Sequence, residues 1–146
     1  MFKGKLIGFT CGAMDLLHAG HVLMLKEARD ECGHLIVGLQ TDPSIDREEK
    51  NSPIQEFEER KIQLEGCRYV DEIQPYTTEA DLLVMLKELH SIFGKRLVRI
   101  IGEDWRGKAF TGHDLPIKVI YNSRDHAWSS SYLRDRIYQA ECLKLK

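Results

Sequence analysis

Short apolar runs alternate with helical patterns along almost the whole chain, and this alternation limits the folds that the sequence can adopt. The apolar runs occupy residues 6–9, 35–39, 69–73, 97–101 and 117–121. Strands that alternate with helices form right-handed βαβ units. We therefore expect an α/β fold with a doubly wound sheet of about five parallel strands and helices on both faces. A chain of 146 residues has the size of one domain, so we expect a single domain over residues 1–146.

Capping residues indicate where the helices begin. Helical spacing over residues 22–32 predicts a first helix that ends before Gly33. Ser52, followed by proline and by Gln55, predicts a helix that runs to about residue 66. Thr78 with Asp81 forms a second capping pattern before an apolar stripe. Serines 129–131 offer caps to a last helix with apolar residues at positions 133, 137 and 140.

Three polar stretches follow expected strands and are candidates for the functional site. They occupy residues 10–21, 102–108 and 122–131. Ligands of doubly wound sheets bind beyond the carboxyl ends of the strands, so topology alone predicts that these stretches converge. A fourth stretch, residues 40–51, is polar and is expected to form a long surface loop. Pro75 is expected to end the third strand.

Composition and charge exclude several classes of protein. The 21 Lys and Arg against 23 Asp and Glu give a formal net charge of -2, which argues against a nucleic-acid-binding protein. No apolar run approaches the roughly 20 residues of a membrane span, and the first residues lack the pattern of a signal peptide. We therefore expect a cytoplasmic protein. The cysteines are scattered without a CxxC pair, so neither a zinc site nor a disulfide is expected: Cys11, Cys32, Cys67 and Cys142.

The stretch from residue 8 to residue 21 is typical of an anion site. A strand ends in small residues, and two histidines flank Ala-Gly where a helix would begin. The first turn of a helix has unpaired backbone N–H groups and partial positive charge, which stabilise a phosphate placed there. His18 and His21 would add side-chain donors. A zinc-binding pair is the alternative interpretation, although no glutamate follows at the metalloprotease spacing.

These residues carry a resemblance to a known family. Residues 16–21 match the HxGH signature of the nucleotidyltransferase superfamily, and residues 102–108 look like the GDDWEGK-type segment of glycerol-3-phosphate cytidylyltransferases. The members of this family also resemble the chain, in the same order and spacing, at three further places: residues 59–61, residues 67–72, and Arg124 with serines 129–131. The resemblance covers roughly residues 5–140 and implies a Rossmann-like fold. Ethanolamine- and choline-phosphate cytidylyltransferases share most of these motifs, as more distantly do bacterial heptose-phosphate adenylyltransferases.

The resemblance implies transfer of CMP from CTP to a small phosphorylated alcohol, giving a CDP-linked product and pyrophosphate. Glycerol 3-phosphate is the acceptor we expect, with phosphocholine and phosphoethanolamine as alternatives. Adenylyl transfer from ATP and a non-catalytic nucleotide-binding regulatory module remain two further hypotheses. The resemblance also implies Mg²⁺ bound with CTP rather than in a metal site of the protein, and a homodimer.

The resemblance assigns roles to individual residues. His18 and His21 would donate to the nucleotide phosphates, with Lys50 and Arg124 as further catalytic cations and Arg47 as the alternative to Lys50. Arg60 and Arg68 would bind the phosphorylated substrate, unless they are exposed arginines in salt bridges. The nucleotide-binding residues would be Thr10, Cys11, Gly12, Gly20, Asp104, Ser129 and Ser130, although Gly12 can equally be a turn residue and the serines can equally be helix caps.

The chain departs from the family pattern at three places. Ala13 and Met14 stand where relatives carry threonine and phenylalanine, and the loop before residue 50 is acidic where lysine is usual. Ala127 replaces a glycine and is followed by Trp128. Asp15 is retained and is expected to brace a loop rather than to act as a catalyst.

Overall fold

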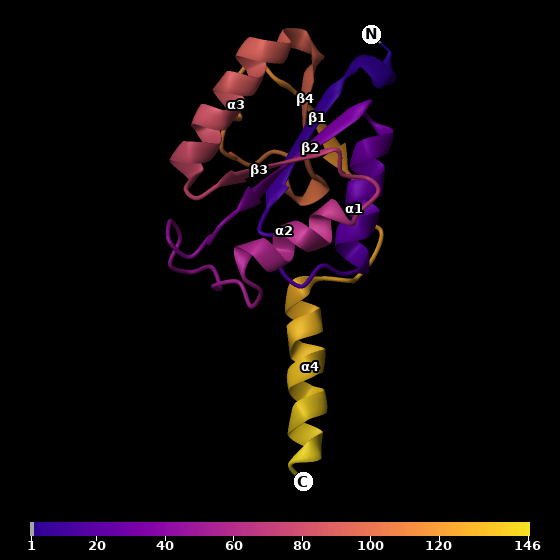
Figure 1. Cartoon of the computed structure of the whole chain (residues 1–146), viewed down its shortest axis with the longest axis vertical. Helices are drawn as coiled ribbons and strands as arrows, with labels where there is room; N and C mark the ends of the chain where they lie inside the picture. Colours follow the sequence, from indigo (N-terminus) through magenta and orange to yellow (C-terminus); the bar gives the residue numbers. More distant parts are fainter. Residues whose placement is uncertain (1) are drawn as a thin grey trace.

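A parallel sheet of five strands forms the centre of the molecule (Figure 1). The computed structural model describes residues 2–146. The strand order is β3-β2-β1-β4-β5, and all neighbours are parallel. The strands are β1 (Ile7–Gly12), β2 (His34–Gln40), β3 (Glu72–Tyr76), β4 (Leu97–Gly102) and β5 (Lys118–Asn122). The helices are α1 (Ala19–Asp30), α2 (Phe57–Glu65), α3 (Glu79–Phe93) and α4 (Ser130–Lys144), with short 3₁₀ turns η1 (Lys3–Lys5), η2 (Gly94–Arg96) and η3 (Glu103–Trp105).

Helices cover both faces of the sheet, which confirms the predicted α/β class. On one face, α1 and α2 bury Leu25 and Leu64 against alternate residues of β2 and β4. On the other face, α3 buries Leu82, Leu86 and Leu89 against Phe9 and its neighbours. The fully buried central strands explain the near-continuous apolar runs of the sequence, because both faces are covered.

The chain reverses its direction of sheet growth between β1 and β4. The segments containing α1 and α2 add β2 and β3 on one side of β1, and α3 then crosses the other face to place β4 beside β1. Such a switch point leaves a crevice at the carboxyl ends of the two central strands. Three stretches meet there: the one after β1, the one after β4 and the one after β5.

The first strand runs to Gly12 rather than ending at residue 9. The predicted start of the second helix is wrong for a reason of tertiary structure. Helix α2 begins at Phe57 rather than near Ser52, because the Asp15 carboxylate accepts the backbone N–H groups of Ile54 and Gln55 at 2.8 and 2.9 Å. Glu59 accepts the N–H of residue 56 instead and supplies the capping contact.

The third strand also lies further along the chain than predicted, over Glu72–Tyr76 rather than residues 69–73. It contains Pro75 instead of ending before it. This strand is at the edge of the sheet, and proline is tolerated at an edge because its missing N–H need not pair with a neighbouring strand. The long loop predicted over residues 40–51 is present but spans residues 41–56, because β2 includes Gln40 and α2 begins only at Phe57.

Helix α4 extends away from the body of the molecule (Figure 1). It begins at the three serines, as predicted, and Ser129 caps it by accepting the N–H of Tyr132 at 3.0 Å. None of its residues is buried, and Ile137, on the apolar face expected from the sequence, is 49% exposed. Among residues 2–146, no helix has the length and apolar character needed to cross a bilayer.

Candidate active site

A cavity of about 480 Å³ lies over the carboxyl ends of β1 and β4. Its walls come from the last half of β1 and the stretch after it, the loop after β2, the start of α3, the last part of β4 and the stretch after it, and the segment that joins β5 to α4. The convergence predicted from topology is therefore present. The sequence-predicted residues that line it are Thr10, Cys11, Gly12, His18, Gly20, His21, Lys50, Asp104, Arg124, Ser129 and Ser130.

The two histidines pack against each other at the start of α1. Their ring centroids are 3.9 Å apart. His18 is the N-cap, and its Nδ1 accepts the backbone N–H of Gly20 at 3.0 Å. His21 Nδ1 accepts the backbone N–H of His18 at 3.2 Å. In a neutral imidazole the nitrogen that accepts carries no proton, so both rings present a protonated Nε2 as a donor.

Burial keeps both imidazoles neutral. Desolvation, followed by the charge of His18, lowers the pKa of His21 to about 4. The pKa of His18 is also lowered, first by desolvation and then by His126 and Arg124. Two donors without formal charge therefore stand beside each other near neutral pH. Each can donate one hydrogen bond to a phosphate oxygen without the repulsion that two imidazolium ions would have.

The start of α1 packs tightly against the segment before α4. A Cβ atom at Gly20 would lie 2.8 Å from both His18 Cε1 and His126 Cε1 and 2.9 Å from the Trp128 carbonyl oxygen. Only glycine fits at this contact. Ser130 Oγ lies 3.3 Å from His18 Nε2, so the first turns of α1 and α4 meet at the histidine. The cavity thus has two helix N-termini in its wall, each with backbone donors and partial positive charge.

Arg124 and Asp104 face each other across the cavity rim. Their closest atoms, Arg124 Nη1 and Asp104 Oδ2, are 3.3 Å apart, and both side chains are about half exposed. An exposed pair of this kind contributes little to stability because solvent screens it. Each partner is therefore free to exchange the other for a nucleotide group.

The loop after β2 brings two cations to the cavity. Lys50 is exposed and Arg47 is half-buried, and both line the cavity. Arg47 Nη2 lies 3.3 Å from a carboxylate oxygen of Glu79 on α3. The loop is held to α3 a second time, because the backbone N–H of Glu79 donates to Asp46 at 2.8 Å.

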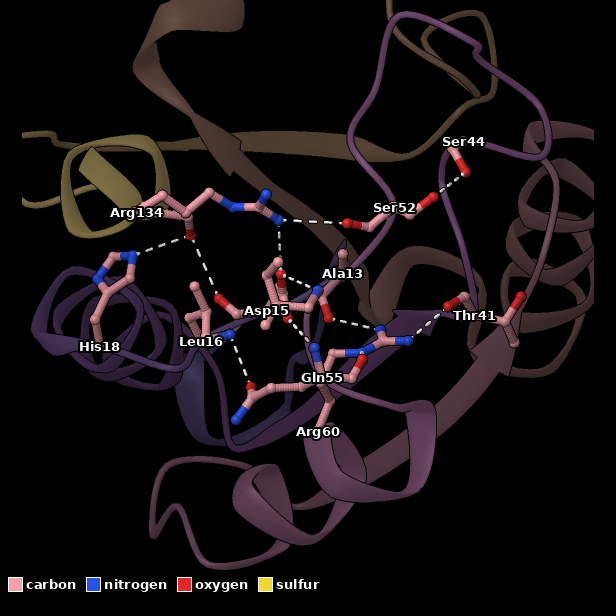
Figure 2. A network of polar contacts seen from close by, with 12 residues as sticks. Ala13, Asp15, Leu16, His18, Thr41, Ser44, Ser52, Gln55, Arg60 and Arg134 are labelled. Carbon is pink, nitrogen blue, oxygen red and sulfur yellow. Dashed lines mark hydrogen bonds and ion pairs between the residues drawn. The ribbon is translucent and has the colours of Figure 1, made fainter. Parts of the chain in front are cut away.

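Asp15 braces the loops that surround the histidine pair, as expected (Figure 2). Besides the two N–H groups before α2, it contacts Arg134 of α4 at 3.0 Å. The same arginine donates to the carbonyl of Ser52 at 3.4 Å. Asp15 therefore ties the segment after β1 to the start of α2 and to α4. It does not line the 480 Å³ cavity, but together with His21 it lines a second pocket.

Arg60 is buried away from the cavity, with 1% of its surface exposed. Its guanidinium donates to the carbonyl oxygens of Gln55, Ala13, Gln40 and Thr41 at 3.1, 2.8, 2.6 and 2.5 Å (Figure 2). Four carbonyls use most of its donors and leave little capacity for a substrate phosphate.

Arg68 is exposed and also lies outside the cavity. Its guanidinium carbon stands 5.2 Å from the centre of the Tyr69 ring. The structure therefore brings eleven predicted site residues together but places neither predicted substrate-binding arginine among them.

Sequence reasoning missed three buried polar residues in the cavity wall, namely Gln40, which ends β2 and is 6% exposed, Arg99 and Asn122. Arg99 stands in the middle of β4 and is 5% exposed, and Asn122 ends β5 and is 2% exposed. Each has one polar atom without a hydrogen-bond partner, Nε of Arg99 and Oδ1 of Asn122. A charged residue inside an otherwise apolar parallel strand is the signal that could have indicated Arg99.

The family of the chain follows from comparison with known proteins. Residues 9–136 match the family model described as "Cytidylyltransferase-like". The chain belongs to this family. A curated relative, the "Bifunctional protein HldE" of Granulibacter bethesdensis, is 38% identical over 113 residues, which are 77% of this chain and 22% of that protein.

A second relative of this cytidylyltransferase-like chain is the "Probable ethanolamine-phosphate cytidylyltransferase" of Encephalitozoon cuniculi, 39% identical over 83 residues, which are 56% of this chain and 26% of the relative. The chain thus spans about a quarter or less of the length of these relatives. A solved structure, the lipopolysaccharide core biosynthesis protein from Thermoplasma volcanium, shares the fold with a TM-score of 0.66 at 22% identity, over 83% of this chain and 98% of that one.

Proposed function

We propose that this cytidylyltransferase-like domain transfers a nucleotidyl group from a nucleoside triphosphate to the phosphate of a small phosphorylated alcohol, with release of pyrophosphate. The observation that supports this most directly is the histidine pair at a helix N-terminus in the cavity wall, where both Nδ1 atoms accept backbone N–H groups. CTP and glycerol 3-phosphate are the substrates that the motifs after β1 and β4 favour.

The reaction needs no nucleophilic side chain. An oxygen of the acceptor phosphate attacks the α-phosphorus of the nucleotide, the new O–P bond forms, and the bond from the α-phosphorus to the bridging oxygen breaks so that pyrophosphate leaves. Such transfers are promoted by positioning and by stabilising charge on the phosphate oxygens. We assign these tasks to His18 and His21, with Lys50 and Arg124 as cations.

The remaining predicted residues would hold the nucleotide. Gly12 and Gly20 let the backbone approach the phosphates, and Ser129 and Ser130 add hydroxyls at the start of α4. Arg124 would exchange Asp104 for the β- and γ-phosphates, since a guanidinium binds phosphate with two parallel hydrogen bonds. Asp104 would then be free to accept from the amino group of the base.

Mg²⁺ enters this scheme as part of the nucleotide substrate. Within residues 2–146, no group of three or more His, Cys, Asp or Glu side chains is placed to hold a metal ion. Mg²⁺ is often held by substrate phosphates, with one or two carboxylates and water. The donor set of the cavity fits that mode of binding, in which the ion neutralises charge on the triphosphate.

Adenylyl transfer from ATP is the second candidate. Asp104 would accept from the base amino group or from the ribose, and both cytosine and adenine present an exocyclic amino group to a carboxylate. The geometry of the Asp104–Arg124 pair therefore suits either nucleotide. The HldE relative and the ethanolamine-phosphate cytidylyltransferase relative share comparable identity with this chain.

Release of pyrophosphate tests the proposal. The protein is incubated with Mg²⁺ and either CTP or ATP, in parallel with glycerol 3-phosphate, phosphocholine, phosphoethanolamine and a heptose phosphate. We expect pyrophosphate only when a nucleotide and an acceptor are both present, and with CTP in preference to ATP. Nucleotide binding without pyrophosphate release for any acceptor would instead favour the regulatory module.

A further inference from the structure

Arg99 is a buried charge in the cavity wall that the proposed reaction does not use. It pairs with Phe9 of β1 in register, so its side chain lies on the face of the sheet that α3 covers. The histidines belong to α1, which covers the opposite face. The single cavity therefore reaches from the histidine pair, across the ends of the central strands, to Arg99.

Arg99 differs from the other buried arginine in how its donors are used. Arg60 donates to four carbonyl oxygens. The contacts of the Arg99 guanidinium are the Thr111 carbonyl at 2.8 Å and a long contact to Cys11 Sγ at 3.6 Å, and its Nε is buried without a partner. A guanidinium has five N–H donors, so Arg99 keeps unused hydrogen-bonding capacity beside the cavity.

The charge of Arg99 is also uncompensated. Among the residues that the structure describes, no Asp or Glu forms an ion pair with it. The centres of the Phe9 and Phe110 rings lie 5.7 and 5.4 Å from its guanidinium carbon. Aromatic faces attract a cation, but a buried charge is usually matched by an opposite charge or by a full set of hydrogen bonds.

The neighbouring polar groups do not supply a free negative charge. Glu79 already contacts Arg47 at 3.3 Å and accepts from Thr111 Oγ1 at 2.8 Å. Burial raises the pKa of Tyr76 well above its usual value, so its phenol stays neutral. This end of the cavity is therefore positive and rich in donors.

We propose that Arg99 donates hydrogen bonds to oxygen atoms at the end of the acceptor remote from the transferred phosphate. The acceptor is then a hydroxylated or acidic phosphate ester, and a phosphorylated amine is disfavoured because its ammonium group would lie beside the Arg99 charge. This inference rests on the proposed function and names the acceptor class of that site. Either hydroxyl or carboxylate oxygens of the substrate could accept these hydrogen bonds.

The kinetic test compares the wild type with Arg99→Met for three acceptors. Glycerol 3-phosphate carries hydroxyls, 3-phosphoglycerate carries a hydroxyl and a carboxylate, and phosphoethanolamine carries an ammonium group. We expect the wild type to prefer the best oxygen-bearing acceptor over phosphoethanolamine by at least about 10-fold in kcat/KM. Arg99→Met should lower kcat/KM for that acceptor by roughly 10- to 100-fold through KM, with the KM of the nucleotide unchanged within about 3-fold. Loss of one charge-assisted contact sets this scale.

Two further variants control for folding and for charge alone. Arg96 is exposed and lies just before β4, at the end of that strand opposite the cavity, so Arg96→Met should leave all three acceptors unchanged. Arg99→Lys keeps the charge without the planar fork and should fall between the wild type and Arg99→Met. Equal loss for phosphoethanolamine and the oxygen-bearing acceptors, or no loss at all, would overturn the assignment.

Binding measurements separate this inference from the proposed reaction. Titration calorimetry of the same three compounds needs no turnover, so it tests Arg99 even if no pyrophosphate is released. We expect glycerol 3-phosphate or 3-phosphoglycerate to bind the wild type more tightly than phosphoethanolamine, and Arg99→Met to remove the difference. Binding of phosphoethanolamine alone, or of none of the three, would contradict the assignment. Absence of pyrophosphate together with the expected binding would contradict only the proposed reaction.

Discussion

The backbone around the histidine pair decides its chemistry. His18 and His21 each use Nδ1 to accept a main-chain N–H, so the tautomer is fixed before any ligand binds. Their rings lie so close, with centroids 3.9 Å apart, that a charge on one ring is unfavourable for the other. The two rings can therefore act as neutral donors that are already oriented, so no free energy of reorganisation is needed during the reaction.

Replacing His18 with alanine should lower kcat by roughly 10²–10³, the scale for losing one donor to the transition state. Steady-state release of pyrophosphate measures this effect. His90→Ala is the matched control, because His90 lies on α3 outside the cavity lining and should leave kcat unchanged. Near-normal turnover of His18→Ala would remove the histidine pair from the mechanism.

The lowered pKa of His21 predicts how stability depends on pH. Its pKa is about 4 in the folded state and about 6.5 when unfolded. The unfolded chain therefore binds more protons between these values, and stability is lost as the pH falls through that window. From pH 7.5 to pH 5, His21 alone should cost about 2 kcal/mol of unfolding free energy.

The matched variant for this effect is His21→Asn. An asparagine side-chain oxygen can accept the His18 N–H but does not titrate in this range. Urea unfolding at pH 7.5 and pH 5 should show a smaller loss for the variant than for the wild type. An equal loss in both proteins would show that His21 is not the group responsible.

At the scale of elements, contacts between residues far apart in the sequence determine those helix and strand boundaries that local sequence patterns do not predict. The capping pattern of Thr78 and Asp81 and the cap at Ser129 were predictable because their partners lie within three residues. The start of α2 was not, because it depends on Asp15, about 40 residues earlier. The position of Pro75 in β3 depends on which strand forms the sheet edge, which no local pattern contains.

The same distinction holds for the candidate site. The motifs after β1, β4 and β5 could be placed together from topology, since parallel strands end at one edge. Topology could not predict which arginines bind substrate and which stabilise the fold. Arg60 and Arg99 are both buried, and only their three-dimensional partners show that carbonyls occupy one guanidinium and leave the other with free donors.

Arg60 should stabilise the fold rather than bind substrate. Arg60→Met would leave the carbonyls of Ala13, Gln40, Thr41 and Gln55 without this donor, at a cost of at least about 3 kcal/mol. Chemical denaturation measures this loss. Arg68→Met, a change at an exposed arginine, should cost less than about 1 kcal/mol. If Arg60→Met were stable but bound acceptor poorly, the assignment to substrate binding would be the correct one.

At the scale of the whole molecule, the body and α4 differ in how they are held. The body has a core on each face of the sheet, whereas α4 has no buried residue. Within residues 2–146, the side-chain hydrogen bonds and the ion pair between α4 and the body are made by Ser130 and Arg134, in its first turns. The match to the family model ends at residue 136, near the last of these contacts.

Deletion of residues 137–146 should therefore leave the body intact. We expect the unfolding free energy to change by less than about 1 kcal/mol, because the removed side chains are largely exposed. Thermal unfolding and pyrophosphate release measure the two consequences. A large loss of stability or of pyrophosphate release in the shortened protein would show that the far half of α4 is needed for folding or for activity. Sedimentation analysis of both lengths would test the expected homodimer.

In the proposed reaction, an oxygen of the acceptor phosphate attacks the α-phosphorus of a nucleoside triphosphate bound in the cavity. Phosphorus NMR of a reaction with CTP, Mg²⁺ and glycerol 3-phosphate tests it most directly, because it shows which phosphorus atom acquires a new bond. We expect equal amounts of pyrophosphate and of a diphosphate that links the α-phosphorus to the acceptor phosphate. Formation of CDP and orthophosphate, or unchanged CTP with every phosphorylated acceptor supplied and with ATP in its place, would contradict it.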